Sequence, residues 1–279
     1  MADRYWVGSI GSQSWANTAN WSTSLGGSGG ASVPATGDNV YIVQGRSQIT
    51  QGLSQSAVEL ALLHIGFQGS IGTSTTPLEI GLAASGGSLD EVLRIWGNDV
   101  SVYIAPTMTG TFPMVQVFGN SGQVTFSDGT LKGFFYFGNA GLVTIASACA
   151  SSGFSVATMG ASVVIQNMGA TDLNGIAVYG GVVECDNATA SSVSVFAGRA
   201  TFTGSSTHAS ISVYGEGVCD YRSSGTITNA QAYGGEFTAS NASLPFTVTS
   251  SLQFVNGALF PSPPVTITYT NPTVKYGFA

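Results

Sequence analysis

The sequence contains little charge. Only 8 % of its 279 residues are charged, and 7 Lys and Arg stand against 14 Asp and Glu, for a net charge of −7. Binding to nucleic acid requires a basic face that neutralises phosphates, so this acidic balance argues against such a partner. No apolar run approaches the roughly eighteen residues of a membrane span. The opening, Met1 to Trp6, lacks the basic and apolar regions of a signal peptide, so we expect production in a cytoplasm.

Helix patterns and the spacings of common catalytic and metal sites are also missing. No window of about eleven residues shows the i, i+3, i+4, i+7 spacing of an amphipathic helix. His64 and His208 lie about 140 residues apart without a triad partner beside them. Neither a His-x-x-x-His spacing nor a calcium-binding repeat occurs. We therefore expect no metal, no cofactor, and histidines that are structural or exposed.

What the sequence does contain is a repeated phrase of alternating apolar residues, a large apolar or aromatic residue, and Gly. Successive glycines of the phrase are 17 to 22 residues apart. The phrase ends at Gly97, Gly119, Gly138, Gly160, Gly180, Gly198, Gly215 and Gly234. Repetition at this period is typical of a solenoid, in which each repeat is one coil and buries its apolar face against its neighbours.

The local pattern indicates strands. Val193 to Phe196 and Ile211 to Tyr214 alternate apolar with small polar residues, which separates them onto two faces of a strand. A second apolar run, such as Val124 to Phe126, follows each Gly, so each period holds at least two strands joined by a Gly bend. The sequence predicts an all-β fold, a single-stranded parallel β-helix. Leu62 to Gly66 reads as an earlier coil, followed by an insertion around residues 73 to 90.

A β-sandwich or jelly roll is the competing fold. Its turns recur every 8 to 12 residues, and it does not repeat one phrase at a near-constant period.

The large side chains of the phrase are expected to form an inward core stack, in which each ring buries about 150 to 250 Å². In one repeat, Met159 occupies the position of the aromatic residue before Gly. An outward ladder that binds sugars is the alternative. The rings of this predicted core aromatic stack are Trp96, Phe118, Phe137, Tyr179, Phe196, Tyr214 and Tyr233.

The three cysteines are expected to be small buried hydrophobes. Cys185 and Cys219 lie two coils apart, about 9 to 10 Å, which exceeds the reach of a disulfide. Cys149 lies elsewhere on its coil. A redox or metal role is the less favoured alternative.

The N-terminal segment differs from the repeats and carries Trp6, Trp15 and Trp21. The first coil of a solenoid exposes an apolar cross-section and an open strand edge, so clustered tryptophans predict a cap. The same three residues are candidates for docking onto a partner.

The segment also contains, in order, Arg4 to Gly8, Trp15, Asn20 to Ser22, a Gly-rich stretch, Val33-Pro34 and Gly37 to Val40. This series resembles the opening of many small virion proteins of tailed bacteriophages. A looser version opens coils of autotransporter-like β-helix passengers. The resemblance covers about 40 of the 279 residues. It implies a trimeric or otherwise oligomeric structural component of a virion, and it carries over no catalytic residue.

The C-terminal segment breaks the pattern again. Three prolines between Leu259 and Pro264 remove hydrogen-bond donors and fix φ, so this run is not expected to continue a strand ladder. We expect a cap on the last coil, and the alternative is an arm that adds a strand to a neighbouring subunit. Pro261, Tyr276 and Phe278 are the candidate docking residues here.

A group of charged residues falls on four successive coils. If the coils register, these residues form a small patch on one lateral face: Glu184, Asp186, Arg199, Glu216, Asp220, Arg222 and Glu236. We expect a solvated face with ion pairs between coils. The alternative is a glycosidase or lyase site built on carboxylates.

Together these patterns predict a cap over residues 1–55, a β-helix over 56–248 and a C-terminal cap or arm over 249–279. The expected function is structural and non-enzymatic: a homotrimeric decoration or cement protein that binds the major capsid protein or another virion protein. The alternative is a tail adhesin or depolymerase that acts on a host glycan. A bacterial surface passenger is a third interpretation, which the missing signal peptide disfavours.

Overall fold

The computed structural model describes residues 1–8, 11, 13–44, 46–86, 89–97, 99–119, 122–139, 141–166, 172–239, 247–255, 258–261, 268–269 and 273–277. The described residues form β-strands and one 3-10 turn, η1 (Thr18–Asn20). The chain divides into two compact units, Met1–Ser152 and Gly153–Ala279. The division at residues 55 and 248 stays a prediction.

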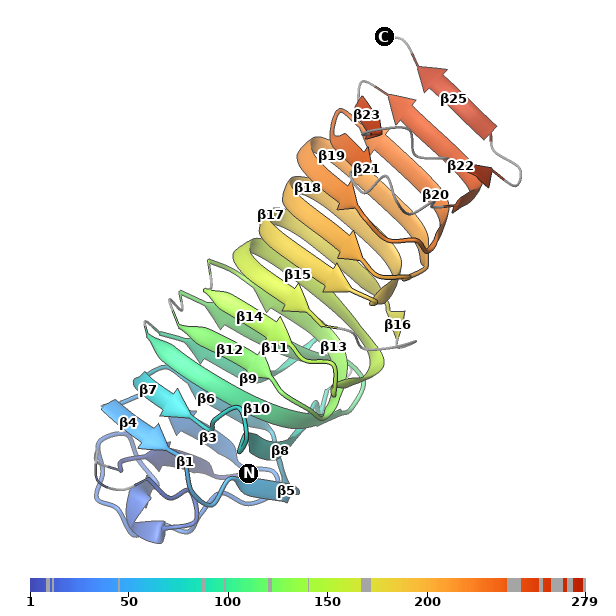
Figure 1. Ribbon diagram of the computed structural model, residues 1–279. Coiled ribbons are helices and arrows are strands. Elements are labelled where there is room, and N and C mark those ends of the chain that lie inside the picture. Colours follow the sequence, from blue (N-terminus) through green and yellow to red (C-terminus); the bar gives the residue numbers. More distant parts are fainter. Residues whose placement is uncertain are drawn as a thin grey trace. The chain divides into compact units, whose positions relative to one another are not determined.

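Unit 1 consists of short strands, seen from blue to green in Figure 1. They are β1 (Asp3–Trp6), β2 (Trp21–Ser22), β3 (Asn39–Ile42), β4 (Arg46–Ile49), β5 (Ser54–Leu60), β6 (Leu62–Ile65), β7 (Gln68–Ile71), β8 (Leu78–Ala83), β9 (Asp90–Trp96), β10 (Val100–Thr109), β11 (Pro113–Phe118), β12 (Gln123–Phe126), β13 (Thr130–Phe137) and β14 (Leu142–Ile145).

Unit 2 contains longer strands, several of which bend and continue from one face of a coil to the next. They are β15 (Ala150–Ile165), in which the unit begins, β16 (Asp172–Leu173), β17 (Gly175–Asp186), β18 (Thr189–Thr203), β19 (His208–Tyr221), β20 (Thr226–Tyr233), β21 (Glu236–Ala239), β22 (Thr247–Val255), β23 (Ala258–Pro261), β24 (Thr268–Tyr269) and β25 (Thr273–Gly277).

Each unit is a parallel β-solenoid, so the predicted fold class is confirmed. In unit 2, Ile176 pairs with Val193, Val193 with Ile211, Ile211 with Ala230, and Ala230 with Leu252. These partners are 17 to 22 residues apart, which is the period of the sequence phrase. All five side chains are buried, so one inward row of the core follows directly from the repeat.

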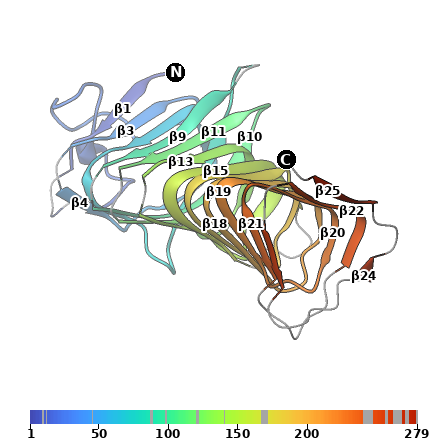
Figure 2. The same ribbon diagram turned by 90° about the horizontal axis from the view of Figure 1, so that it is seen from above.

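The coils of unit 2 have two main faces. The first face comprises the early parts of β17, β18 and β19 with β20 and β22, and the second face comprises their later parts with β21 and β23. Figure 2 shows β20 and β22 on one side of the unit and β21 on the other. A short third face includes β16 and β24. The interior between the faces is filled by apolar side chains such as Val195, Phe202 and Phe237.

The bend between the first and second faces depends on glycine. Gly181 and Gly198 have φ of 82° and 81°, a left-handed conformation that side chains disfavour. A Cβ on Gly198 would lie 2.4 Å from the Gly181 carbonyl oxygen, and one on Gly181 would lie 2.3 Å from that of Ala161. Glycine at the bend, Gly181 in one coil and Gly198 in the next, therefore allows both the turn and the close approach of successive coils.

Two local expectations are wrong. The region between residues 73 and 90 is not a simple insertion, because it contains β8, which pairs in parallel with β5 and β10 and forms another face of the unit 1 coil. The C-terminal prolines do not end the ladder at once, because β23 pairs with β21 as far as Pro261, which lies opposite Ala239. Proline is tolerated there at the end of a strand, where few ladder bonds remain to be lost.

Candidate functional site

The aromatic residues of the phrase form a row, but on the outside of the coils. In unit 2 the row consists of Tyr179, Phe196, Tyr214 and Tyr233, one from each of four successive coils. Tyr179 is 50 % exposed and Phe196 37 % exposed, while Tyr214 and Tyr233 are partly exposed. The predicted inward stack is therefore wrong for these four rings. Met159, expected in the same slot, is also exposed.

Strand geometry explains the error. In β18, Val193 and Val195 point inward, so Ser194 and Phe196 must point outward, because successive side chains alternate between the two faces. The aromatic residue follows the second inward residue and so falls on the solvent side. The alternation that identified the strands thus also predicts the outward position.

Unit 1 has its own outward row, made of Tyr5, Tyr41, His64, Trp96, Phe118 and Tyr136. Trp96 is 46 % exposed, and the Arg94 guanidinium lies 4.8 Å from its ring centroid. Phe137 is the exception: it is fully buried, so the prediction of an inward ring is confirmed at this position. It pairs with the inward Val117, so Tyr136 takes the outward place beside Phe118.

The rings of the unit 2 row stack face to face. Successive centroids are 4.9, 5.0 and 5.4 Å apart, and successive ring planes differ by 3°, 10° and 15°. Each inner ring thus has both faces covered by its neighbours, and the row presents ring edges to solvent. A sugar stacks on an open ring face, so this arrangement disfavours the outward sugar ladder as well.

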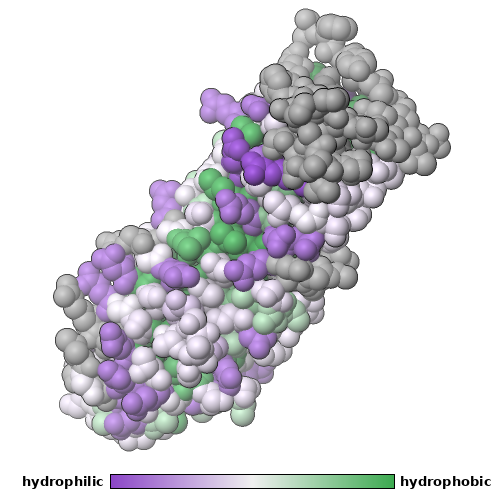
Figure 3. All heavy atoms as spheres, in the orientation of Figure 1, coloured by the Kyte–Doolittle hydropathy of each residue, from purple (hydrophilic) through white to green (hydrophobic). Residues whose placement is uncertain are grey.

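The first face of unit 2 lies beside this row and is uncharged from β15 to β22; in β25, the next strand of the face, Lys275 lies opposite Gln253. The outward positions of this face from β15 to β22 hold small or uncharged polar residues, and the charged residues of β17, β18 and β19 lie at the bend or on the second face. The two outward rows are Ser155, Gly175, Ser192, Ser210, Asn229 and Ser251, and Ala157, Ala177, Ser194, Ser212, Gln231 and Gln253. Outside these two rows, Figure 3 shows hydrophobic side chains among hydrophilic ones over β15, β17 and β18.

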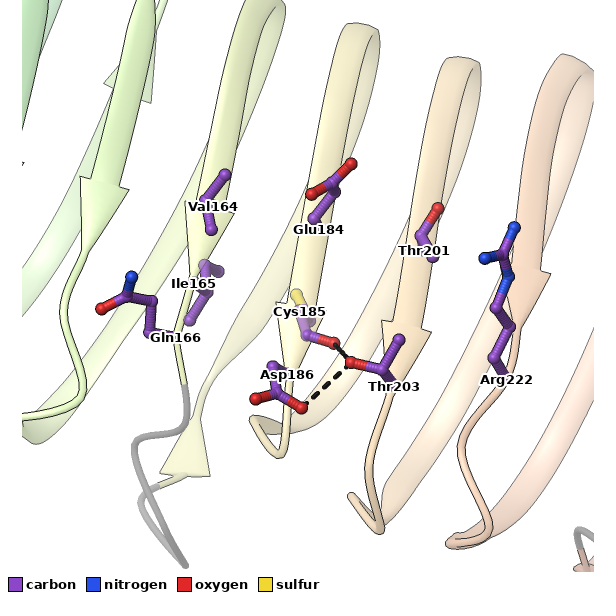
Figure 4. Close-up of a pocket in the computed structure, with 9 residues that line it drawn as sticks. All are labelled: Val164, Ile165, Gln166, Glu184, Cys185, Asp186, Thr201, Thr203 and Arg222. Atoms are coloured by element: carbon purple, nitrogen blue, oxygen red, sulfur yellow. Dashed lines mark hydrogen bonds between the residues drawn. The ribbon is translucent and has the colours of Figure 1, made fainter. Parts of the chain in front are cut away.

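The predicted charged patch does come together, on the second face of unit 2. Glu184 pairs with Thr201, and Thr201 pairs with Asp220, so the three lie in one outward row on successive coils. Beside them is a shallow pocket of about 250 Å³. Figure 4 shows its lining residues across four neighbouring strands: Val164, Ile165, Gln166, Glu184, Cys185, Asp186, Thr201, Thr203 and Arg222.

Asp220 lies beneath two guanidinium groups. Its side chain is only 4 % exposed, and Arg222 donates to its Oδ2 from Nε at 2.9 Å and from Nη2 at 2.5 Å. Arg199 Nη1 lies 3.6 Å from the same oxygen. The hydrogen bond that Arg222 donates to Asp220 and the negative charge of that carboxylate raise the pKa of Arg222. Asp220 thus holds arginine side chains in place, and little of its own carboxylate is accessible.

The other charged residues of the patch lie around this group. Asp186 Oδ1 accepts a hydrogen bond from Thr203 at 3.0 Å, at the edge of the pocket. Glu236 pairs with Val218 and accepts from the Thr238 hydroxyl. Glu216 lies at the exposed bend, opposite Ala197. The sequence could place these residues on neighbouring coils but could not show which of them share a row.

The candidate docking residues of the N-terminus are fully buried. Trp6, Trp15 and Trp21 pack edge to face, and Trp21 Nε1 donates to the Trp15 carbonyl at 2.7 Å. The rings form the core of the N-terminal segment and offer no surface to a partner. Of the C-terminal candidates, Pro261 lies in β23 and Tyr276 in β25, while Phe278 lies outside the described residues.

The cysteines and His208 are buried, with shifted pKa values. Cys149, Cys185 and Cys219 are free, as expected, and burial raises the pKa of each thiol, that of Cys149 to about 12. Burial lowers the pKa of His208 to about 4. Its Nδ1 accepts from the Ala190 N–H at 3.4 Å, and its ring packs against Phe202 and Tyr221.

His64 is half-buried between Tyr41 and Trp96, and its pKa is lowered by burial and by Arg94. In the part of the chain that the structure describes, no three His, Cys, Asp or Glu side chains are grouped as a metal site would require. No described helix is long and apolar enough to cross a membrane. Comparisons of the chain with protein-family models, with curated proteins and with solved structures found no match.

Proposed function

We propose that this chain is a non-enzymatic structural protein of a phage virion, and that its copies associate laterally through unit 2 into a homotrimer. The observation that carries the proposal is the combination of the outward aromatic row with the first face beside it, which is uncharged from β15 to β22. Protein surfaces that stay in water usually carry mixed charges, whereas the cores of interfaces are depleted in charge and enriched in Tyr, Phe and Met.

The aromatic row fits burial against protein. Tyr179 and Phe196 are held by stacking, so little side-chain entropy remains to be lost when their edges are covered. Rigid aromatic side chains of this kind are typical interface anchors. The tyrosine hydroxyls give the aromatic row a polar edge. The Tyr233 hydroxyl, for example, donates a hydrogen bond to Gln231 Oε1 at 3.1 Å.

Another copy of the chain suits this surface best. A three-fold ring uses two different patches of each subunit, because its contacts are head to tail. Unit 2 offers two such patches side by side, the aromatic row and the flat first face with Ser194 near its centre. The row of one copy packs on the first face of the next, and three such contacts close the ring.

The virion assignment rests on the sequence series from Arg4 to Val40 and on the acidic, charge-poor composition. In such a role the protein bridges neighbouring capsomers by apolar and backbone contacts and resists internal pressure. Capsids that lack the protein are expected to burst at a lower temperature than capsids that carry it, and equal burst temperatures would remove the support for a cementing role.

The association is tested by measuring mass in solution. The wild-type chain is expected at about 85 kDa, three times its 28.4 kDa, and Ser194→Glu should shift it to the monomer because the charge is desolvated at the contact. Thr207→Glu, at an exposed turn before β19, is the matched control and should leave the mass unchanged. A monomeric wild-type protein would contradict the proposal.

A host-glycan adhesin is the second candidate, and the pocket beside Glu184 favours it. The depolymerase form of this alternative is weaker, because Asp220, one of the two carboxylates on which it would depend, is buried beneath Arg222 and Arg199.

A further inference from the structure

The pocket on the second face contains polar groups that make no hydrogen bond within the described chain. The Glu184 carboxylate, the Gln166 amide and the Thr201 hydroxyl line the pocket, and each lacks an intramolecular hydrogen-bond partner among the described residues. Together they provide both donors and acceptors. The remaining polar side chains, Asp186 and Thr203, are bonded to each other.

These groups lie in two rows across four coils (Figure 4). One row holds Val164, Glu184 and Thr201, and the other holds Gln166, Asp186, Thr203 and Arg222. Neighbouring strands are about 4.8 Å apart, so each row extends about 10 to 15 Å. Such a surface can contact several groups along an extended ligand.

The chemistry of the lining excludes other ligand classes. Glu184 and Asp186 would repel a phosphate or a sulfate, and the charge of Arg222 is already countered by Asp220. The described residues offer no group of three metal-binding side chains. An apolar ligand would leave Glu184 and Gln166 without partners, which is costly.

We propose that this pocket binds a saccharide chain through its hydroxyl groups. Hydroxyl groups donate to the Glu184 carboxylate and exchange hydrogen bonds with the Thr201 hydroxyl and the Gln166 amide. Arg222, held by Asp220 with its side chain half exposed, places guanidinium N–H groups at the rim, where they donate to sugar oxygens. Val164 supplies an apolar contact for a sugar ring. The proposal rests on the second candidate function, the host-glycan adhesin, and names the groups that would bind the glycan; it does not depend on the lateral association of copies.

The test is binding of the purified full-length protein to arrayed oligosaccharides of hexoses, N-acetylhexosamines and uronic acids. The wild-type protein should bind at least one class, and titration calorimetry with that oligosaccharide should give a dissociation constant. Glu184→Gln and Thr201→Val should each weaken binding, Glu184→Gln by about tenfold or more, because a charge-assisted hydrogen bond is lost.

Glu216→Gln is the matched control, since it makes the same change at an exposed carboxylate outside the pocket, and it should bind like the wild type. Absence of binding to every arrayed class at millimolar oligosaccharide would overturn the proposal. So would equal affinity of the wild type and both pocket variants. Because all these proteins should keep the mass of the wild type, failure here is distinguishable from failure of the proposed association.

Discussion

The rings of Tyr179 and Phe196 stack with their planes 3° apart and their centroids 4.9 Å apart. The stack follows from the register of the preceding residues, because Val178 lies opposite Val195. One coil spacing in a parallel sheet equals the distance at which two rings pack face to face. The solenoid repeat therefore turns a single aromatic position into a rigid exterior row, which contributes both to the stability of the coils and to the surface they present.

Replacement of Phe196 should destabilise unit 2. Phe196→Ala removes two ring contacts, with Tyr179 and with Tyr214, and should lower the free energy of unfolding by about 2 kcal/mol. Phe196→Tyr keeps both stacks and is the control. Urea unfolding measures the difference, and an alanine variant as stable as the wild type would show that the row adds nothing to the fold.

Stability should fall with acid because of His208. The imidazole is buried and its pKa is about 4, while an unfolded histidine has a pKa of about 6.5. Between these values the unfolded chain binds a proton that the folded chain excludes, so stability is present above about pH 6.5 and is lost as the pH falls towards 4. The loss is on the order of 3 kcal/mol.

His208→Gln provides the comparison for this pH effect. Other titrating groups contribute equally to both proteins, so the difference between their unfolding free energies isolates His208. We expect that difference to change between pH 7 and pH 4.5. A constant difference would mean that the pKa of His208 is the same in the folded and unfolded states.

The three cysteines should be inert in the native protein. Cys149, Cys185 and Cys219 are buried, and burial raises the pKa of each thiol, so little thiolate is present at neutral pH. A thiol-reactive disulfide reagent should label none of them within minutes, and all three after denaturation. Rapid labelling of the folded chain would contradict the buried positions.

Trp96 should account for the quenchable tryptophan fluorescence. It is exposed, whereas Trp6, Trp15 and Trp21 are fully buried in the N-terminal cluster. Acrylamide should quench one part of the wild-type emission, and that part should be missing in Trp96→Phe. If the quenchable part persists, at least one tryptophan of the cluster is open to solvent, and the cluster could then contact a partner.

The sequence was sufficient to predict the solenoid, because its period is set by the coil and is visible in the spacing of glycines such as Gly198 and Gly215. It was also sufficient to assign the aromatic row to the outside, since Phe196 follows the inward Val195, although the hydrophobicity of the ring favoured the opposite choice. The alternation of side chains along a strand determines which face a ring occupies, and it outweighs the general preference for burying aromatic rings.

Register between coils was harder to predict. Coil lengths vary, so the sequence alone could not show that Glu184, Thr201 and Asp220 share one row, or that Phe137 lies opposite the inward Val117. The burial of Asp220 depends on arginines from its own coil and the preceding one, Arg222 and Arg199. Such contacts between coils require coordinates.

The most direct test of the account is electron cryomicroscopy of the purified protein at side-chain resolution. If copies associate as proposed, the map shows a three-fold assembly in which the exposed edges of Tyr179 and Phe196 of one copy contact the first face of the next, around Ser194. Isolated copies, or an assembly in which that aromatic row faces solvent, would contradict the proposal.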